Sequence, residues 1–231
     1  MVTAIIVAAG RGERMGSGTD KLFIKVCGHP IICHTWRLFD SCPGINEIIL
    51  VIRPEMERDF VEMTQHYNFS TPYKFVAGGK QRQESVWNGL QAASPQSEIV
   101  AIHDGARPCT SRSLIEAAIS AAREHGAAVA AQPVSDTIKA SADGQFIGQH
   151  LDRSQLWSVQ TPQVFKISVI RRALELVHHQ GLTVTDDTAA CELIGHKVKL
   201  VIDQTPNPKA TVPADLTYIE MLLQGSVAHS L

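Results

Sequence analysis

The sequence lacks long apolar segments and any marked excess of charge of one sign. None of its apolar runs approaches the roughly 20 residues that a transmembrane helix requires, and no charged-then-apolar leader precedes the first apolar run. The 21 Lys and Arg residues nearly balance the 23 Asp and Glu residues, which gives a net charge of −2. This balance argues against a broad nucleic-acid or membrane-surface partner, so we expect neither.

Cysteine and histidine patterns that are typical of disulfide or metal sites are also missing. The five cysteines show no C-x-x-C spacing, and the ten histidines show no H-E-x-x-H motif. An odd number of irregularly spaced cysteines is typical of reduced thiols, which predicts a cytoplasmic protein. The adjacent pair His178 and His179 is interpreted as a solvated helix end rather than as a metal site.

Strand and helix patterns alternate up to residue 133, and the 44% apolar composition of the 231 residues allows one sizeable core. This alternation predicts an α/β fold, a Rossmann-like three-layer α/β/α arrangement around a mixed, mostly parallel sheet. The predicted strands cover residues 3–9, 47–53, 73–77, 99–103, 127–132 and 197–202. The predicted helices cover residues 30–41, 55–66, 83–93, 111–125, 168–180, 186–194 and 215–224.

The alternation stops at residues 134–160, where polar and apolar residues alternate around the turn signal Ala142-Asp143-Gly144. We predict a protruding β-arm here rather than a unit of the core. An arm without its own core is marginally stable and packs on something else, and a second copy of the chain is the simplest partner. The sequence therefore predicts one domain over residues 1–231, with a dimerisation arm at 134–160 within it.

A loop rich in glycine and cations follows the first predicted strand. Glycines at positions 10, 12, 16 and 18 let the backbone approach an anion, and Arg11, Arg14 and Lys21 match phosphate in charge. The loop is neither a P-loop, because no Lys-Ser or Lys-Thr follows, nor a dinucleotide fingerprint, because Met15 replaces its third glycine. It predicts a polyphosphate site. The alternative is a flexible loop with solvated charges.

Two later loops carry polar residues at the carboxyl ends of predicted strands, where parallel sheets bind their ligands. Gly78-Gly79 opens a helix whose free N–H groups, together with the Ser85 hydroxyl, can read a pyrimidine edge; the alternative is a turn and a capped helix. Asp104 suits a magnesium–phosphate site, and Arg107 can clamp a phosphate. The alternative is an internal Asp–Arg pair that shapes the loop.

Weaker motifs become specific when they are read in order. The series A-A-G-x-G-x-R-M, D-K, G-G-x-x-R-x-x-S-V, H-D-G-A-R-P, D-T-I-K, D-R-x-x-L-W-x-x-Q-T-P-Q, T-D-D and N-x-K-x-T extends over residues 3–220. This series resembles the 2-C-methyl-D-erythritol 4-phosphate cytidylyltransferase family of the non-mevalonate isoprenoid pathway. The resemblance implies a nucleotidyltransferase that transfers CMP from CTP to the sugar phosphate and releases pyrophosphate.

The resemblance also implies roles for individual residues. Four residues would be catalytic: Arg14, Lys21, Arg153 and Lys209. The CTP-binding set would be Ala8, Ala9, Gly10, Arg11, Gly12, Gly79, Arg82, Ser85, Asp104 and Gly105. The substrate-binding set would be Arg107, Thr137, Arg153, Thr185 and Thr211, with Thr137 and Arg153 supplied by the arm of the partner in a homodimer. Mg²⁺ would be held mainly by the CTP phosphates, with Asp104 as its protein contact.

Two residues depart from the family pattern. Pro208 precedes Lys209 where the family has an aliphatic residue, and Lys80 stands where some members have an acidic one.

The nearest alternative function is that of ribitol-5-phosphate cytidylyltransferase, which the Asp152-Arg153 to Trp157 segment disfavours. A nucleotide-binding regulatory module is disfavoured by the intact charged residues. A dinucleotide dehydrogenase is disfavoured because the second predicted strand ends at Arg53 rather than at an acidic residue.

Overall fold

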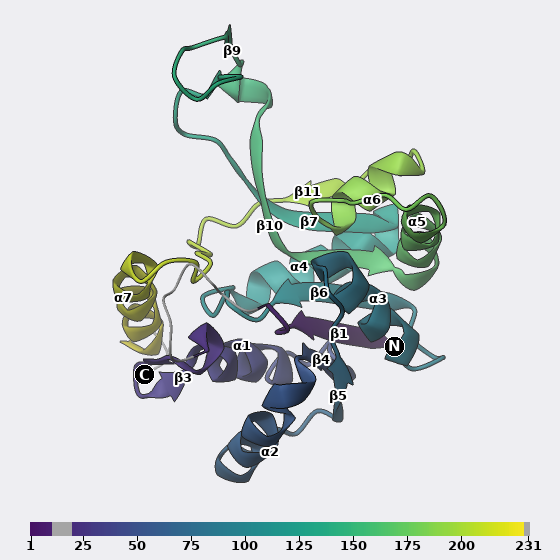
Figure 1. Cartoon of the computed structure of the whole chain (residues 1–231). Helices are drawn as coiled ribbons and strands as arrows, with labels where there is room; N and C mark the ends of the chain where they lie inside the picture. Colours follow the sequence, from purple (N-terminus) through teal and green to yellow (C-terminus); the bar gives the residue numbers. More distant parts are fainter. Residues whose placement is uncertain (11–19, 229–231) are drawn as a thin grey trace.

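The centre of the molecule is a seven-stranded sheet, seen in a computed structural model that describes residues 1–10 and 20–228 (Figure 1). The strands run parallel except β10, which is antiparallel to both of its neighbours. From one edge to the other they are β11 (Lys199–Val201), β7 (Ala127–Pro133), β10 (Trp157–Lys166), β6 (Ile99–Asp104), β1 (Val2–Val7), β4 (Glu47–Ile52) and β5 (Tyr73–Ala77). The predicted mixed, mostly parallel sheet is confirmed.

Helices cover both faces of the sheet, because alternate residues of the buried strands point to opposite sides. In β1, Ala4 and Ile6 belong to one apolar cluster and Ile5 to the other. The first face packs against α1 (Ile31–Asp40), α2 (Glu57–His66), α4 (Arg112–His125) and α7 (Ala214–Ala228). The second packs against α3 (Arg82–Ala92), α5 (Ile167–His179) and α6 (Asp187–Leu193). This is the predicted three-layer arrangement.

Local signals account for many of the boundaries. The Ser111 side chain caps α4 by accepting from the Leu114 N–H, and Gly126 ends that helix with a φ of +88° that favours glycine. The remaining elements are short: β2 (Lys25–Val26), β3 (His29–Pro30), β8 (Lys139–Ala140), β9 (Gln149–His150) and the 3₁₀ turns η2 (Lys21–Phe23), η3 (Pro54–Met56) and η4 (Arg153–Gln155). No helix in the described part of the chain is both long and apolar enough to cross a membrane.

The arm projects from the sheet as predicted, but its predicted end is wrong. Residues 157–160, placed in the arm, are the beginning of β10, where Trp157 pairs with Pro133 of β7. The sequence hid this strand because it contains Pro162, which has no N–H to donate to a neighbouring strand. The register shift between Val159 and Gln163 accommodates that proline. The arm is therefore residues 134–156, and Figure 1 shows it extending well away from the body of the molecule.

Candidate functional site

A cavity of about 250 Å³ opens at the carboxyl edge of the sheet, where the loops after β1, β5 and β6 meet. Parallel strands bring their carboxyl ends to one edge, and this is why residues far apart in sequence line one space. Nine predicted site residues line it: Ala8, Ala9, Gly10, Lys21, Gly79, Arg82, Ser85, Asp104 and Lys209. Arg11, Gly12 and Arg14 lie outside the described residues.

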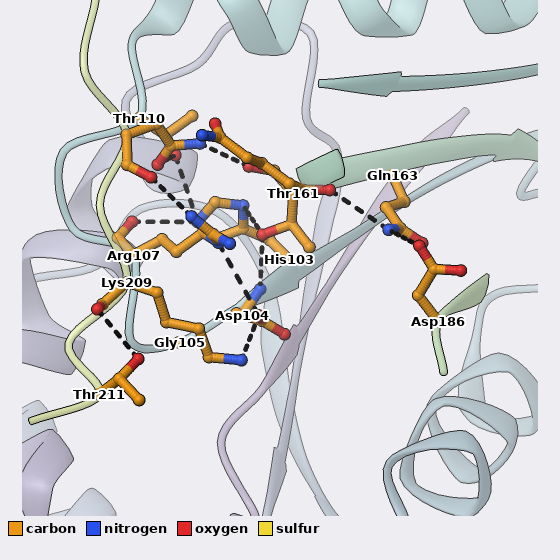
Figure 2. Close-up of polar contacts among 12 residues, drawn as sticks. His103, Asp104, Gly105, Arg107, Thr110, Thr161, Gln163, Asp186, Lys209 and Thr211 are labelled. Atoms are coloured by element: carbon orange, nitrogen blue, oxygen red, sulfur yellow. Dashed lines mark hydrogen bonds and ion pairs between the residues drawn. The ribbon is translucent and has the colours of Figure 1, made fainter. Parts of the chain in front are cut away.

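Asp104, the last residue of β6, is a buried carboxylate among three cations. Its Oδ2 accepts from Lys209 Nζ at 2.7 Å, its Oδ1 accepts from Arg82 Nε at 3.3 Å, and Arg107 Nε lies 3.9 Å from Oδ2. Burial alone raises the pKa of Asp104, but the three cations outweigh it and hold that pKa well below its usual range. Figure 2 shows Lys209 pointing toward this carboxylate. Asp104 is thus ionised and holds Lys209 at the cavity.

Arg82 is held by a second carboxylate that lies behind the cavity. Its Nη1 donates to Oδ2 of Asp187, the fully buried first residue of α6, at 2.8 Å. Burial lowers the pKa of an arginine, but the two neighbouring carboxylates raise that of Arg82 further above its usual value. Next to it, Gln83 accepts from the Val184 N–H and donates to the Leu182 carbonyl. The start of α3 is therefore fixed to residues 182–187.

The loop after β5 requires its glycines. A Cβ on Gly78 would lie 2.3 Å from Ala9 Cβ, and one on Gly79 would lie 2.3 Å from Glu84 Cβ. The Gly79 N–H donates to Ser85 Oγ at 3.1 Å, and the Ser85 hydroxyl donates to the Gln81 carbonyl at 3.2 Å. The backbone of this loop is thus held against the loop after β1, at the mouth of a cavity that both loops line.

Comparison with known proteins agrees with this geometry. Residues 2–225 match the model of the family described as IspD, 2-C-methyl-D-erythritol 4-phosphate cytidylyltransferase. The chain belongs to this family. Its reaction is the transfer of CMP from CTP to 2-C-methyl-D-erythritol 4-phosphate, which yields 4-diphosphocytidyl-2-C-methyl-D-erythritol and pyrophosphate in non-mevalonate isoprenoid precursor synthesis.

Individual relatives match over nearly the whole chain. The 2-C-methyl-D-erythritol 4-phosphate cytidylyltransferase of Geobacillus thermodenitrificans is 42% identical over 226 residues, 98% of each chain. The structure of 4-diphosphocytidyl-2C-methyl-D-erythritol synthase from Anaerococcus prevotii matches with a TM-score of 0.85 and 33% identity, covering 96% of both chains. That of the cytidylyltransferase from Thermus thermophilus matches with a TM-score of 0.79 and 31% identity, covering 97% of this chain and 100% of that one.

Other residues that the cytidylyltransferase resemblance selects lie outside the cavity lining. Arg107 is folded into its own loop, where its Nη1 donates to the Asn207 carbonyl at 2.6 Å. Thr211 Oγ1 donates to the Lys209 carbonyl, and Thr185 is exposed just before α6. Three more of these residues lie outside the lining: Gly105, which follows Asp104 directly, and Thr137 and Arg153, which lie exposed on the arm.

Arg53 is a site residue that sequence reasoning missed. Its Nη1 donates to the Gly10 carbonyl at 3.0 Å, and its Nη2 forms an ion pair with Asp20. Arg53 therefore ties together the two residues that flank segment 11–19, which carries the cytidylyltransferase signature. The sequence shows Arg53 as a cation at the end of a predicted buried strand. It does not show that Arg53 pairs with Gly10 and Asp20.

A buried hydrogen-bond network supports Asp104 from behind (Figure 2). His103 Nε2 lies 3.1 Å from the Arg107 carbonyl, so this nitrogen carries the hydrogen. His103 Nδ1 then accepts from the Thr161 hydroxyl at 3.1 Å, while Thr161 Oγ1 itself accepts from the Asp104 N–H at 3.1 Å. His103 is fully buried, and this burial lowers its pKa to about 4. The network therefore requires a neutral His103.

This neutral histidine predicts a pH dependence of stability. An unfolded histidine has a pKa of about 6.5, so below that pH the unfolded chain binds a proton that folded His103 refuses. The free energy of unfolding is expected to decrease by about 3 kcal/mol through this residue as the pH falls from about 6.5 to about 4. Urea unfolding of the wild type and of His103→Gln across this range checks it. The free energy of unfolding of the variant should depend less steeply on pH than that of the wild type. Equal pH dependence in the two proteins would contradict a neutral, buried His103.

Proposed function

We propose that the cavity at the carboxyl edge binds CTP and that Lys21, Lys209 and Arg14 stabilise the charge that develops at its α-phosphate. The observation that carries this proposal is the presence of Lys21 and Lys209 in one cavity with the loops after β1 and β5. Gly79 and Ser85 would read the cytosine, with Arg82 ordering their loop. Ala8, Ala9, Gly10, Arg11 and Gly12 would surround the triphosphate, and Gly105 would contact the nucleotide next to Asp104.

The proposed mechanism relies on charge rather than on a protein base. A phosphate monoester has a second pKa near 6, so the sugar phosphate is a nucleophilic dianion near neutral pH. The obstacle is the approach of one anion to another, which positioned cations relieve. His103, the histidine next to Asp104, is neutral and held inside the hydrogen-bond network, so it is not placed to act as a base. Arg107, Thr185 and Thr211 would place the sugar phosphate.

A divalent cation such as Mg²⁺ fits this site through one protein contact. No cluster of three or more His, Cys, Asp or Glu side chains that could hold a metal exists in residues 1–10 and 20–228. Asp104 is the carboxylate that lines the described part of the cavity, and hard oxygen donors suit Mg²⁺. We therefore assign most of the metal's ligands to the CTP phosphates. When bound, the ion would neutralise phosphate charge.

Nucleotide binding tests the location of the site and the need for metal together. Amide hydrogen exchange is measured with CTP and Mg²⁺, and again with EDTA in place of the metal. Residues 78–85 and 104–107 are expected to be protected only when Mg²⁺ is present, because the ion offsets the repulsion among the phosphates. Protection confined to other segments would contradict the proposed site, and equal protection with EDTA would contradict the role of the metal.

We further propose that the chain is a cytoplasmic, single-domain homodimer in which the arm of one subunit completes the site of the other. Thr137 and Arg153 are exposed, and Arg153 Nη1 donates only within the arm, to the Ser135 carbonyl at 2.7 Å, among the contacts described. At the arm tip, Phe146 and Ile147 are 75% and 72% exposed. Exposed apolar side chains of this size mark an interaction surface, and a second copy of the chain would bury them.

Subunit complementation distinguishes exchange of the arm from a role within one chain. Lys21→Ala and Arg153→Ala are each expected to be nearly inactive as homodimers. If Arg153 acts in the partner's site, each mixed dimer contains one intact site, so random mixing restores about a quarter of wild-type activity. If Arg153 acts in its own chain, mixing restores nothing. A monomer by light scattering with full activity would also contradict the proposal.

A further inference from the structure

Asn207 is a buried polar residue two positions before Lys209, in a segment without helix or strand. It is only 3% exposed, yet both polar groups of its side chain are paired. Its Oδ1 accepts from the Thr110 hydroxyl at 2.7 Å, and its Nδ2 donates to the Thr161 carbonyl at 2.8 Å. Its own carbonyl accepts from Arg107. A buried amide whose oxygen and nitrogen are both hydrogen-bonded to other chain segments fixes the backbone to which it belongs.

These contacts close a ring through three separate chain segments. Asp104 donates its N–H to the hydroxyl of Thr161, whose carbonyl accepts from Asn207. The chain then continues through Pro208 to Lys209, whose Nζ returns to Asp104 Oδ2 at 2.7 Å. The position of the lysine relative to the carboxylate is therefore set by the ring as a whole. Figure 2 shows Asp104, Thr161 and Lys209 converging in this way.

Lys209 depends on such support because its side chain is long and partly exposed. Four rotatable methylene groups make the ammonium position sensitive to the backbone, and the side chain is 38% exposed. On the far side of the lysine, the Ala210 N–H donates to the Ala106 carbonyl at 2.8 Å. Pro208 has no backbone N–H that would need a hydrogen-bond acceptor. Asn207 and Ala210 thus anchor the segment on either side of Lys209, and Asn207 is the anchor that uses a side chain.

We propose that Asn207 is a positioning residue that fixes Lys209 for the transfer of the cytidylyl group, with Thr110 as the donor that orients it. This inference rests on the proposed catalytic role of Lys209. It also accounts for the Pro208 departure, because a proline at this position removes no hydrogen bond of the ring.

Substitution of Asn207 by aspartate keeps the size of the side chain and removes the N–H donor. Asn207→Asp is expected to lower kcat by about 10- to 100-fold, since a displacement near 1 Å is enough for such a loss. The ratio of kcat/KM for CTP to that for UTP is expected to stay unchanged, because Gly79 and Ser85 lie outside the ring. Partial unfolding would lower the apparent kcat and also leave this ratio unchanged, so thermal unfolding must first show that the variant is folded.

Two variants of Thr110 test the same positioning role with a smaller change to the buried network. Thr110→Val removes the hydroxyl that orients Asn207 and is expected to lower kcat in the same direction by about 10-fold. Thr110→Ser keeps the hydroxyl and should retain near wild-type kcat. Equal activity of the two variants would contradict the orienting role. If Asn207→Asp does not fold, Thr110→Val takes its place in the decisive experiment.

The decisive experiment is a double-mutant cycle with Lys209→Ala. If Asn207 acts through Lys209, Asn207→Asp should cost at least 10-fold in the wild-type background but less than about 2-fold when Lys209 is already alanine. Equal costs in both backgrounds would overturn the inference while leaving Lys209 catalytic. Full turnover of Lys209→Ala alone would instead contradict the proposed function of that lysine.

Asn46→Asp is the matched control. Asn46 lies before β4 at the opposite edge of the sheet, and its Oδ1 accepts from the Val2 N–H at 2.8 Å, a bond that aspartate keeps. The substitution Asn46→Asp makes the same change of amide to carboxylate as Asn207→Asp, and it should leave kcat unchanged. Thermal unfolding of all variants shows that the comparison is made among folded proteins.

Discussion

Replacing Lys21 by alanine is expected to lower kcat by about 100-fold or more, with the fold intact. Loss of one positioned charge-stabilising group typically has an effect of about this size on kcat. Lys21 lines the cavity, and its Nζ donates to the Ala210 carbonyl at 3.3 Å, next to Lys209 in sequence. The two lysines thus approach the same part of the cavity from different chain segments. The measurement is steady-state pyrophosphate release with CTP and the sugar phosphate.

Lys25→Ala provides the matched control. Lys25 is four residues further along, exposed in β2, and does not line the cavity. Its removal should leave kcat within about twofold, as is usual for surface substitutions. Unchanged turnover of folded Lys21→Ala would contradict the assigned role, whereas equal losses in both variants would indicate a general effect of lowered positive charge.

Replacing Asp104 by asparagine is expected to lower both stability and activity. Three cations lose their common counter-charge, and breaking a buried pair in this way costs about 3 to 5 kcal/mol in free energy of unfolding. Lys209 and Arg82 also lose the carboxylate that orients them. We therefore expect kcat to fall by about 100-fold, the scale of a positioning loss. Urea unfolding and pyrophosphate release measure the two effects separately.

Glu47→Gln separates the catalytic effect from the structural one. Glu47 is also a buried carboxylate; it accepts from Thr3 Oγ1 at 2.9 Å and pairs with Lys74 Nζ at 2.8 Å, at the opposite edge of the sheet. This variant should lose stability yet keep the kcat of the folded enzyme. If Asp104→Asn behaved in the same way, Asp104 would only shape its loop, which was the alternative that the sequence left open.

The sequence predicted those parts of the fold that local signals specify. Strand β5 was predicted with its observed bounds, Tyr73–Ala77, because Gly78-Gly79 marks its end. The convergence of the loops after β1, β5 and β6 was expected because the strands were predicted to be parallel, although the loop after β7 was expected there as well. Strand β10 was not predicted, because its proline is tolerated only through a register shift. That shift depends on neighbouring strands, which local patterns do not describe.

The supporting contacts of the site could not be read from the sequence. Lys209 and Asp104 are 105 residues apart, as are Arg82 and Asp187, while Arg53 and Asp20 are 33 apart. Such pairings are fixed only when helices and strands are packed. The resemblance predicts which residues contact the nucleotide, but it gave no role to Asn207 or Arg53. The partners of these two side chains lie in distant segments of the chain.

The reversed direction of β10 has an evolutionary consequence. Because β10 runs against β7, residues 134–156 leave and re-enter the sheet at the edge where the cavity opens, with Trp157 opposite Pro133. The projecting segment is therefore a long hairpin loop and not an added layer. Lengthening a loop has a small entropic cost, about 0.6 kcal/mol per doubling. An ancestor could thus gain or lose this extension by insertion or deletion in one connection, without altering the register of any strand in the sheet.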